Sequence, residues 1–220
     1  MIERPEFIDV DDMSQLPPAP EGYRYIDFPG GTKTFQCCLV PRELSRNTFV
    51  SQYGHLLDEM VQPIYENKGI NVAQDYSFAV PGFYIVAYDE RVPALDIASD
   101  NLAMRTGNLL KYIRAGMRDA LKIKQINLYH DERATGANSV HYGLMPKYGS
   151  AEGNQSLYGF DLMGYLSQFN FKDTKQEIIE CNNKMKEFIK VSGLREKDDA
   201  IYELRNKVLE TYMLDPQRLG

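Results

Sequence analysis

The chain has 220 residues, a formal net charge of −6 and 43% hydrophobic residues, values typical of a globular protein with a proper core. The acidic balance argues against a protein that binds a nucleic-acid polymer through bulk positive charge, but it allows a small basic pocket for one nucleotide. The three cysteines include no C-x-x-C pair, which argues against a structural zinc site and a disulfide framework. We expect no metal and no cofactor.

The first residues are acidic and lack the apolar segment of a secretory signal. No run approaches the roughly 18 apolar residues that a membrane-spanning helix needs. We therefore expect a cytoplasmic protein that does not contact a membrane.

The N-terminal part of the sequence predicts few regular elements. Proline and glycine in the run SQLPPAPEG predict that residues 1–22 form an extended arm rather than a packed element. A short strand is predicted at 35–40, where Pro41 closes it. Apolar residues recur at helical spacing between 48 and 65, which predicts a helix that Pro63 ends or kinks.

The middle of the sequence alternates strand-like and helical patterns. Two strand-like runs, at 75–80 and 83–88, are joined by a Pro-Gly pair and predict a hairpin or a bent strand pair. Asp100 can cap a long helix whose apolar face continues to Leu121. A further strand is predicted at 125–130, and a polar loop leads from it into the run SVHYGLMP.

Beyond Tyr148 the sequence predicts a loop and then two charged helices. The first helix is predicted from Thr174 and Glu177, which have the spacing of a capping box, and the second near 199–212. We therefore divide the chain into an N-terminal arm, strand and helix extension at 1–65, an antiparallel α+β domain at 66–150 and a C-terminal helical extension at 151–220.

The run SVHYGLMP, at 139–146, contains one of only three histidines in the chain. On a strand, His141 shares a face with Ser139 and Gly143, while the apolar residues between them point the other way and can pack on a helix. A glycine in a strand often marks the close approach of a ligand or of another backbone segment, and Ser139 supplies a hydroxyl beside the imidazole.

The loop before this run carries groups that suit phosphate oxygens, namely Arg133, Gly136 and Asn138. If the two neighbouring strands pair, His130 or a residue next to it approaches the face of His141. Each of these residues also has an ordinary interpretation, as a surface charge, a loop residue or a histidine with a backbone hydrogen bond.

Three stretches resemble the histidine-triad superfamily of nucleotide hydrolases and transferases: PGFYIVAYDE, YHDERATG and SVHYGLMPKY. In that family a PGH-x-LVIPK strand precedes a long helix. A strand ending in Asn-Asp-Gly and a loop follow, and then the signature His-φ-His-φ-His-φ-φ-Pro-Arg, where φ is apolar. The resemblance covers well under half of the chain.

With Pro146 as the anchor, His141 falls on the middle histidine, which the family uses as the nucleophile toward the α-phosphate. Ser139 stands where the first histidine of the signature would be, and Gly143 where the third would be. The histidine of PGH is Phe83 here. The position of the nucleophile is therefore kept, while the histidines that usually support it are replaced.

The resemblance implies roles for other residues as well. His130 lies near the position of the family's asparagine and, with Ser139, would assist His141. Substrate would be bound by Arg133, Gly136, Asn138, Gly143 and Lys147.

The resemblance implies a HIT-like α+β fold, with an antiparallel sheet of about five strands, a long helix, and helical N- and C-terminal extensions. The implied function is a nucleotide-conjugate hydrolase or nucleotidyltransferase that acts at the α-phosphate through a histidine nucleophile. The alternative is a catalytically degenerate relative, which binds nucleotides or serves as a scaffold. A different reaction on the same fold is a third reading. A nucleotide or nucleotide conjugate is the expected partner, and a homodimer is the expected assembly.

Overall fold

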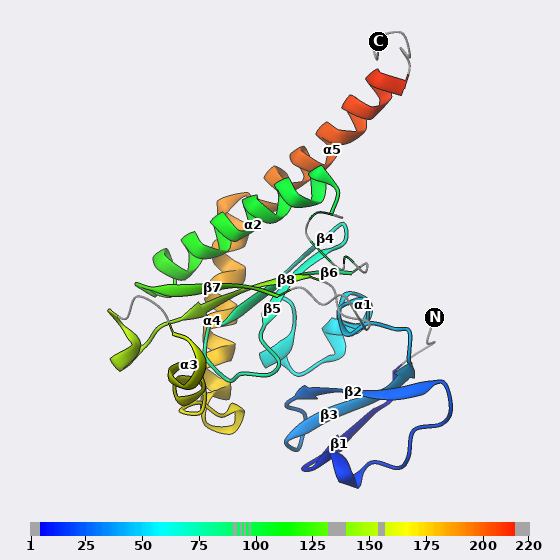
Figure 1. The fold of residues 1–220 in the computed structure, drawn as a ribbon, viewed down its shortest axis with the longest axis vertical. Coiled ribbons are helices and arrows are strands. Elements are labelled where there is room, and N and C mark those ends of the chain that lie inside the picture. The colour runs from blue at the N-terminus through cyan, green and yellow to red at the C-terminus, as the bar shows by residue number, and fades with distance from the viewer. Residues whose placement is uncertain are drawn as a thin grey trace.

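The computed structural model describes residues 5–89, 92, 94, 96, 98–131, 140–153 and 157–213, without the side chains of 150 and 205–213 (Figure 1). Ser139, Arg133, Gly136 and Asn138, four of the predicted site residues, lie outside the described residues. None of the helices searched within this part of the chain is long and apolar enough to cross a membrane.

A five-stranded antiparallel sheet forms the centre of the molecule, in the order β4-β5-β6-β8-β7. Its strands are β4 (Tyr65–Asn67), β5 (Ile70–Gln74), β6 (Tyr84–Tyr88), β7 (Ile126–Asp131) and β8 (His141–Pro146). The predicted α+β class and the sheet of about five antiparallel strands are thus confirmed, as are the strands expected near 83–88 and 125–130.

The helices α2 (Asp100–Asp119) and α5 (Leu194–Met213) lie on one side of this sheet, and α4 (Phe171–Ser192) runs behind the sheet from that side to the other (Figure 1). The main core forms between them, where Leu109 and Ile113 of α2 and Met185 of α4 meet the apolar side chains of the strands. The predicted long helix is confirmed, although Ser99 caps it by accepting a hydrogen bond from the backbone N–H of Leu102.

The two predicted C-terminal helices are also present, with different starts. The helix α4 begins at Phe171, where the side chain of Asn170 accepts from the backbone N–H of Asp173, so the capping box predicted at Thr174 is wrong. Gly193, with φ of 63°, separates α4 from α5. A short helix, α3 (Gly159–Leu166), precedes them.

A second, three-stranded sheet is formed by β1 (Phe7–Val10), β2 (Tyr23–Pro29) and β3 (Phe35–Pro41), in the order β1-β3-β2. Figure 1 shows it below the large sheet, on the side away from α2. The prediction of an unpacked arm is wrong for β1, because its residues pair with β3 and Phe7 packs edge-on against Phe49 at 6.2 Å.

The helix predicted over 48–65 is shorter in the structure. The helix α1 (Arg46–Tyr53) ends where the chain turns back through 3-10 turns at Gly54–Leu56 and Glu59–Val61. A Cβ at Gly54 would stand 2.9 Å from Pro63 Cδ, so the turn brings these two residues into contact. Pro63 therefore packs against the end of the helix instead of continuing it. Further 3-10 turns lie at Met13–Gln15 and Gly149–Ala151.

The strand predicted over 75–80 is wrong in position. The strand β5 ends at Gln74, because the side chain of Asp75 accepts hydrogen bonds from the backbone N–H groups of Ser77 and Phe78, at 2.7 and 2.6 Å. Such local bonds replace the strand ladder. The hairpin of this region instead joins β4 to β5, through Lys68 and Gly69 with φ of 41° and 85°.

Candidate functional site

The pairing of β7 with β8 fixes which side chains accompany His141. The register sets Asp131 opposite His141, and His130 opposite Tyr142. Val140 and Leu144 are buried in the core below the helices, and Tyr142 packs against it. Because neighbouring residues of a strand point to opposite faces, His141 projects from the face that the helices leave uncovered.

A cavity of about 340 Å³ lies over this face (Figure 1 gives the positions of its elements). Its floor consists of the side chains of β5 and β6, and its walls come from the loop after β5, from β2 and from the start of α1. The residues that matter for its chemistry are Arg24, Arg46, Asn71, Asp75, Tyr76 and His141. The sheet thus has one face for the core and one for the cavity.

The imidazole of His141 is about a quarter exposed, with 27% of its side chain accessible. Its Nε2 lies 3.9 Å from Oδ2 of Asp131, its partner across the two strands. A carboxylate from the neighbouring strand thus accompanies the imidazole at the cavity.

Asp75 is the carboxyl group that ends β5 and lines the cavity. Burial raises the pKa of Asp75, although the hydrogen bonds from Ser77 and Phe78 and the nearby His141 and Arg46 act in the opposite direction. The effect of burial is the larger one, so the net pKa of Asp75 lies above its ordinary value. Perturbed carboxyl groups in a cavity are candidates for binding or catalysis.

Two arginines from the N-terminal part of the chain form the outer wall. The guanidinium of Arg46 bonds Oδ1 of Asp27 at 2.9 Å and lies over the ring of Phe28, 5.4 Å from its centroid. Arg24 donates from Nη2 to the carbonyl oxygen of Leu44 at 2.8 Å, while its buried Nε has no hydrogen-bond partner. The cavity therefore combines an imidazole with two cationic side chains.

Gly143, the predicted neighbour of His141, lies under an aromatic ring. A Cβ at this position would stand 3.0 Å from Cε2 of Phe83 and 3.3 Å from Cδ1 of Ile85. Phe83 is itself buried, in an apolar cluster with Met145 and Tyr165. The two departures from the family pattern, glycine for the third histidine and phenylalanine for the histidine of PGH, thus contact each other and fill one space.

The structure does not bring His130 and Lys147 to His141. The ring of His130 stacks on Tyr142 with centroids 4.9 Å apart, on the face that carries the helices. Lys147 is buried after the end of β8, where its backbone N–H donates to the carbonyl oxygen of Gln125. Of the predicted residues in the described part, only His141 lines the cavity.

Sequence reasoning missed Arg24, Arg46 and Asp75. A signal for Asp75 exists, since an aspartate followed two residues later by serine suits a side-chain-to-backbone turn. No local signal identifies the two arginines, because they reach the cavity only when the two sheets pack together.

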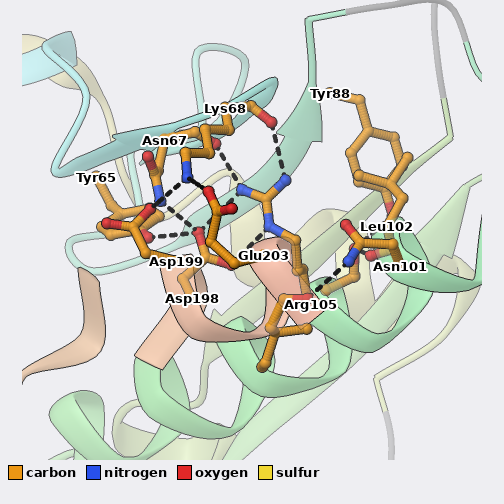
Figure 2. Close-up of polar contacts among 12 residues, drawn as sticks. Tyr65, Asn67, Lys68, Tyr88, Asn101, Leu102, Arg105, Asp198, Asp199 and Glu203 are labelled. Carbon is orange, nitrogen blue, oxygen red and sulfur yellow. Dashed lines mark hydrogen bonds and ion pairs between the residues drawn. The ribbon is translucent and has the colours of Figure 1, made fainter. Parts of the chain in front are cut away.

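A second polar cluster lies at the opposite side of the large sheet, among α2, α5 and the hairpin of β4 and β5 (Figure 2). The guanidinium of Arg105 binds the carboxylate of Asp198 through two bonds, of 2.7 and 2.9 Å. Its Nη1 and Nη2 also donate to the backbone carbonyl oxygens of Lys68 and Asn67, both at 2.8 Å. Both charged side chains are buried, at 2% and 0% exposure.

Asp198 receives two further hydrogen bonds in this cluster, from the hydroxyl of Tyr65 at 2.7 Å and from the amide of Asn67 at 2.9 Å (Figure 2). Burial alone would raise the pKa of Asp198, but the bonds from Arg105, Tyr65 and Asn67 outweigh it and lower the pKa. The cluster joins α5 to α2 and to the sheet.

Neither the protein-family models nor the curated proteins contain a match to this sequence. Similar solved structures include a hypothetical histidine triad nucleotide-binding protein from Sulfolobus tokodaii, 16% identical with a TM-score of 0.46, over 65% of this chain and 93% of that one. A zinc-bound histidine triad family protein from Mycobacterium smegmatis is 13% identical with a TM-score of 0.46, over 65% and 95%.

A structure described as uridylyltransferase is 13% identical with a TM-score of 0.46, and the match covers 76% of this chain and 59% of that one. At such identities and TM-scores these likenesses carry no argument about function.

Proposed function

We propose that the chain binds a nucleotide or nucleotide conjugate in the His141 cavity and acts at its α-phosphate with His141 as the nucleophile, as a hydrolase or nucleotidyltransferase. The observation that carries this proposal is the cavity of about 340 Å³ that holds an imidazole and two arginines on the uncovered face of the sheet. This volume lies at the lower end of small-molecule sites, which span roughly 300–1,000 Å³.

The lining of the cavity suits the parts of a nucleotide. Ala73, Ile85 and Ala87 offer a flat apolar floor for a ring, since two of them carry only a methyl group. Asp75 uses Oδ1 for its backbone bonds, so its other oxygen is available to accept hydrogen bonds from sugar hydroxyls. Phosphate oxygens would be bound by the arginines and the imidazole.

The reaction has two steps. A neutral ring nitrogen of His141 attacks phosphorus, and the N–P bond forms while the P–O bond to the leaving group breaks; the leaving oxygen takes a proton from solvent. Water or an acceptor hydroxyl then attacks the same phosphorus and loses its proton to solvent, and the N–P electron pair returns to the imidazole. Asp131, 3.9 Å away, would stabilise the positive charge of the intermediate.

The proposal is tested by turnover and adduct formation with a panel of nucleoside diphosphates, dinucleoside polyphosphates and nucleotide sugars. We expect turnover by His141→Asn to be at least about a hundredfold slower than by the wild type, because the variant lacks the nucleophile. Nucleotide binding should persist. Mass spectrometry of the quenched wild-type protein should find a nucleoside monophosphate on the peptide that contains His141.

The matched control is His55→Asn, because His55 is exposed and belongs to the Gly54–Leu56 turn, outside the cavity lining. This variant should turn over substrate at the wild-type rate. Equal turnover of His141→Asn and wild type would contradict the proposed nucleophile.

The alternative function is nucleotide binding or a scaffold role without turnover. The contact between Phe83 and Gly143 favours it, because the ring fills the space where a third histidine would assist the leaving group. Calorimetric titration beside the turnover assay separates the two, since binding without turnover supports the alternative.

Three further proposals stand beside it: a homodimer, from the resemblance; a cytoplasmic location, from the absence of a signal segment in the sequence; and a division at 1–65, 66–150 and 151–220, from the order of the predicted elements. Light scattering tests the first, and limited proteolysis tests the division. A nucleic-acid polymer is not expected as a partner, because the net charge is −6.

A further inference from the structure

The outer wall of the His141 cavity is built by elements that lie before the segment with the family resemblance. Arg24 belongs to β2, and Arg46 is the first residue of α1. The third polar side chain of the wall is Tyr76, in the loop after β5. The N-terminal sheet therefore contributes directly to the cavity rather than standing beside the domain.

Two hydrogen-bond donors of this wall have no acceptor. The Nε of Arg24 and the hydroxyl of Tyr76 are both buried and without a hydrogen-bond partner. Buried donors of this kind are rare in folded proteins, because each has lost its bonds to water without a replacement. Two of them in residues that line the same cavity call for a common explanation.

The ring of Phe28 contacts two residues of the wall, Tyr76 and Arg46. Tyr76 meets this ring edge-on with centroids 5.1 Å apart, and the guanidinium of Arg46 lies over it at 5.4 Å. Asp27 binds Arg46 through one oxygen and offsets part of its charge. A guanidinium carries five N–H donors, so the bond to Asp27 leaves others for a ligand.

The charges around the wall include Arg24 and Arg46 against Asp27 and Asp75, with His141 at the inner end and the carboxyl group of Glu66 near Tyr76. Asp27 is tied to Arg46, and Asp75 is tied to the backbone of its own turn. The unassigned hydrogen-bonding capacity of Arg24, Arg46 and Tyr76 therefore consists of donors, which suit an anion, whereas the unpartnered acceptor of the lining, Oε1 of Gln74, lies in the floor.

We infer that Arg24, Arg46 and Tyr76 form a second anion subsite, which binds a phosphate group beyond the α-phosphate of the ligand. The inference rests on the proposed function, since it assumes that a nucleotide occupies the cavity. A phosphate suits the wall better than a carboxylate does, because its three oxygens match donors that arrive from three side chains. Side-chain rotamer changes on binding are common and would bring the buried donors to these oxygens.

The test compares nucleotides that differ only by this phosphate. The affinities of AMP, GMP, CMP and UMP are measured by calorimetric titration beside those of ADP, GDP, CDP and UDP. For the base that binds best, we expect the diphosphate to bind about tenfold more tightly or better, as hydrogen bonds to a charged group allow. In Arg24→Met this ratio should fall toward one, because the diphosphate loses more affinity than the monophosphate does.

Two further variants keep the test decisive. Tyr76→Phe removes only a hydroxyl without a partner, so it should fold normally and lower the ratio several-fold even if Arg24→Met does not fold. Arg42→Met is the matched control, because Arg42 follows β3 on the same small sheet and is not in the cavity lining. It should leave the ratio unchanged.

The outcomes separate this inference from the proposed function. If nucleotides bind but the ratio is unchanged in Arg24→Met and Tyr76→Phe, the second subsite is refuted and nucleotide binding stands. If none of the eight nucleotides binds the wild-type protein, the proposed function fails and the subsite fails with it.

Discussion

The molecule contains two polar clusters of similar composition on different sides of the large sheet. The closed cluster, around Arg105 and Asp198, and the His141 cavity each combine arginine, aspartate, asparagine and tyrosine side chains. In the closed cluster each nitrogen of the guanidinium has an acceptor, and the carboxylate has four bonds to side-chain donors. In the cavity the Nε of Arg24 and the hydroxyl of Tyr76 have none.

The difference indicates what each cluster does. Buried charges that find all their partners within the protein hold elements together, as Arg105 and Asp198 hold α5 on α2 and β4. Donors that line a cavity and lack partners gain their bonds only when a ligand supplies acceptors. The hydrogen bonds of the Arg105 and Asp198 side chains are complete and those of the cavity are not, and this difference supports the proposed binding role of the cavity.

The largest expected effect is on stability, from breaking the closed cluster. Arg105→Met should lower the free energy of unfolding by about 3–5 kcal/mol, because it leaves the buried carboxylate of Asp198 without its counter-ion. Urea unfolding followed by circular dichroism measures this change. The control is Arg118→Met, which breaks an ion pair with Asp119 whose side chains are 63% and 51% exposed, and which should change the stability far less because solvent screens the pair.

Similar losses in these two arginine variants would contradict the comparison. They would mean that the buried, fully hydrogen-bonded Arg105 contributes no more to the free energy of unfolding than an arginine in an exposed ion pair does.

The next effect is also on stability, and it concerns Gly143, which lies under the ring of Phe83 on the face of the sheet that carries His141. Gly143→Ala should cost about 1–3 kcal/mol, because the new Cβ would stand 3.0 Å from the ring of Phe83 and force it to shift. Adding Phe83→Leu should recover part of the loss, since a smaller side chain makes room. A double variant whose loss equals the sum of the two single losses would show that the two positions are not coupled.

The sequence was sufficient for the elements whose pattern is local. The strands β7 and β8 and the helix α2 follow from alternation and helical periodicity, and the face of His141 follows from the alternation of β8. The strand predicted at 75–80 failed because the side chain of Asp75 bonds the backbone of its own turn, which the alternation of apolar residues conceals.

The cavity wall was beyond sequence reasoning for a different reason. Arg24 reaches the cavity of His141 from β2 of the small sheet and Arg46 from the start of α1, across about a hundred positions of the chain, and no short motif links them. The partners of Arg105 are equally remote, because Asp198 lies on another helix. Contacts of this kind depend on how layers pack, and a single sequence does not reveal that packing.

The smallest expected effect is on the pH dependence of stability, where ionisation of Asp198 and ionisation of Asp75 should act in opposite directions. The pKa of Asp198 is lowered in the fold, so its carboxylate stabilises the protein above the ordinary aspartate pKa of about 3.9, and this stability is lost as the pH falls through the folded pKa. Burial raises the pKa of Asp75, so ionisation of Asp75 costs stability as the pH rises from about 3.9 through its folded pKa.

Asp198→Asn should therefore lower the thermal midpoint at pH 7, and Asp75→Asn should raise it slightly, because the amide oxygen can still accept the bonds from Ser77 and Phe78. The difference for Asp75 should shrink as the pH falls toward 3, because its carboxyl group becomes protonated, and the difference for Asp198 should begin to shrink below about 3.9 and continue through its lower folded pKa. Differential scanning calorimetry from pH 3 to pH 8 measures them. A lower midpoint for Asp75→Asn at pH 7 would show that the charge of Asp75 serves the fold as that of Asp198 does, and the cavity would lose its distinction from the closed cluster.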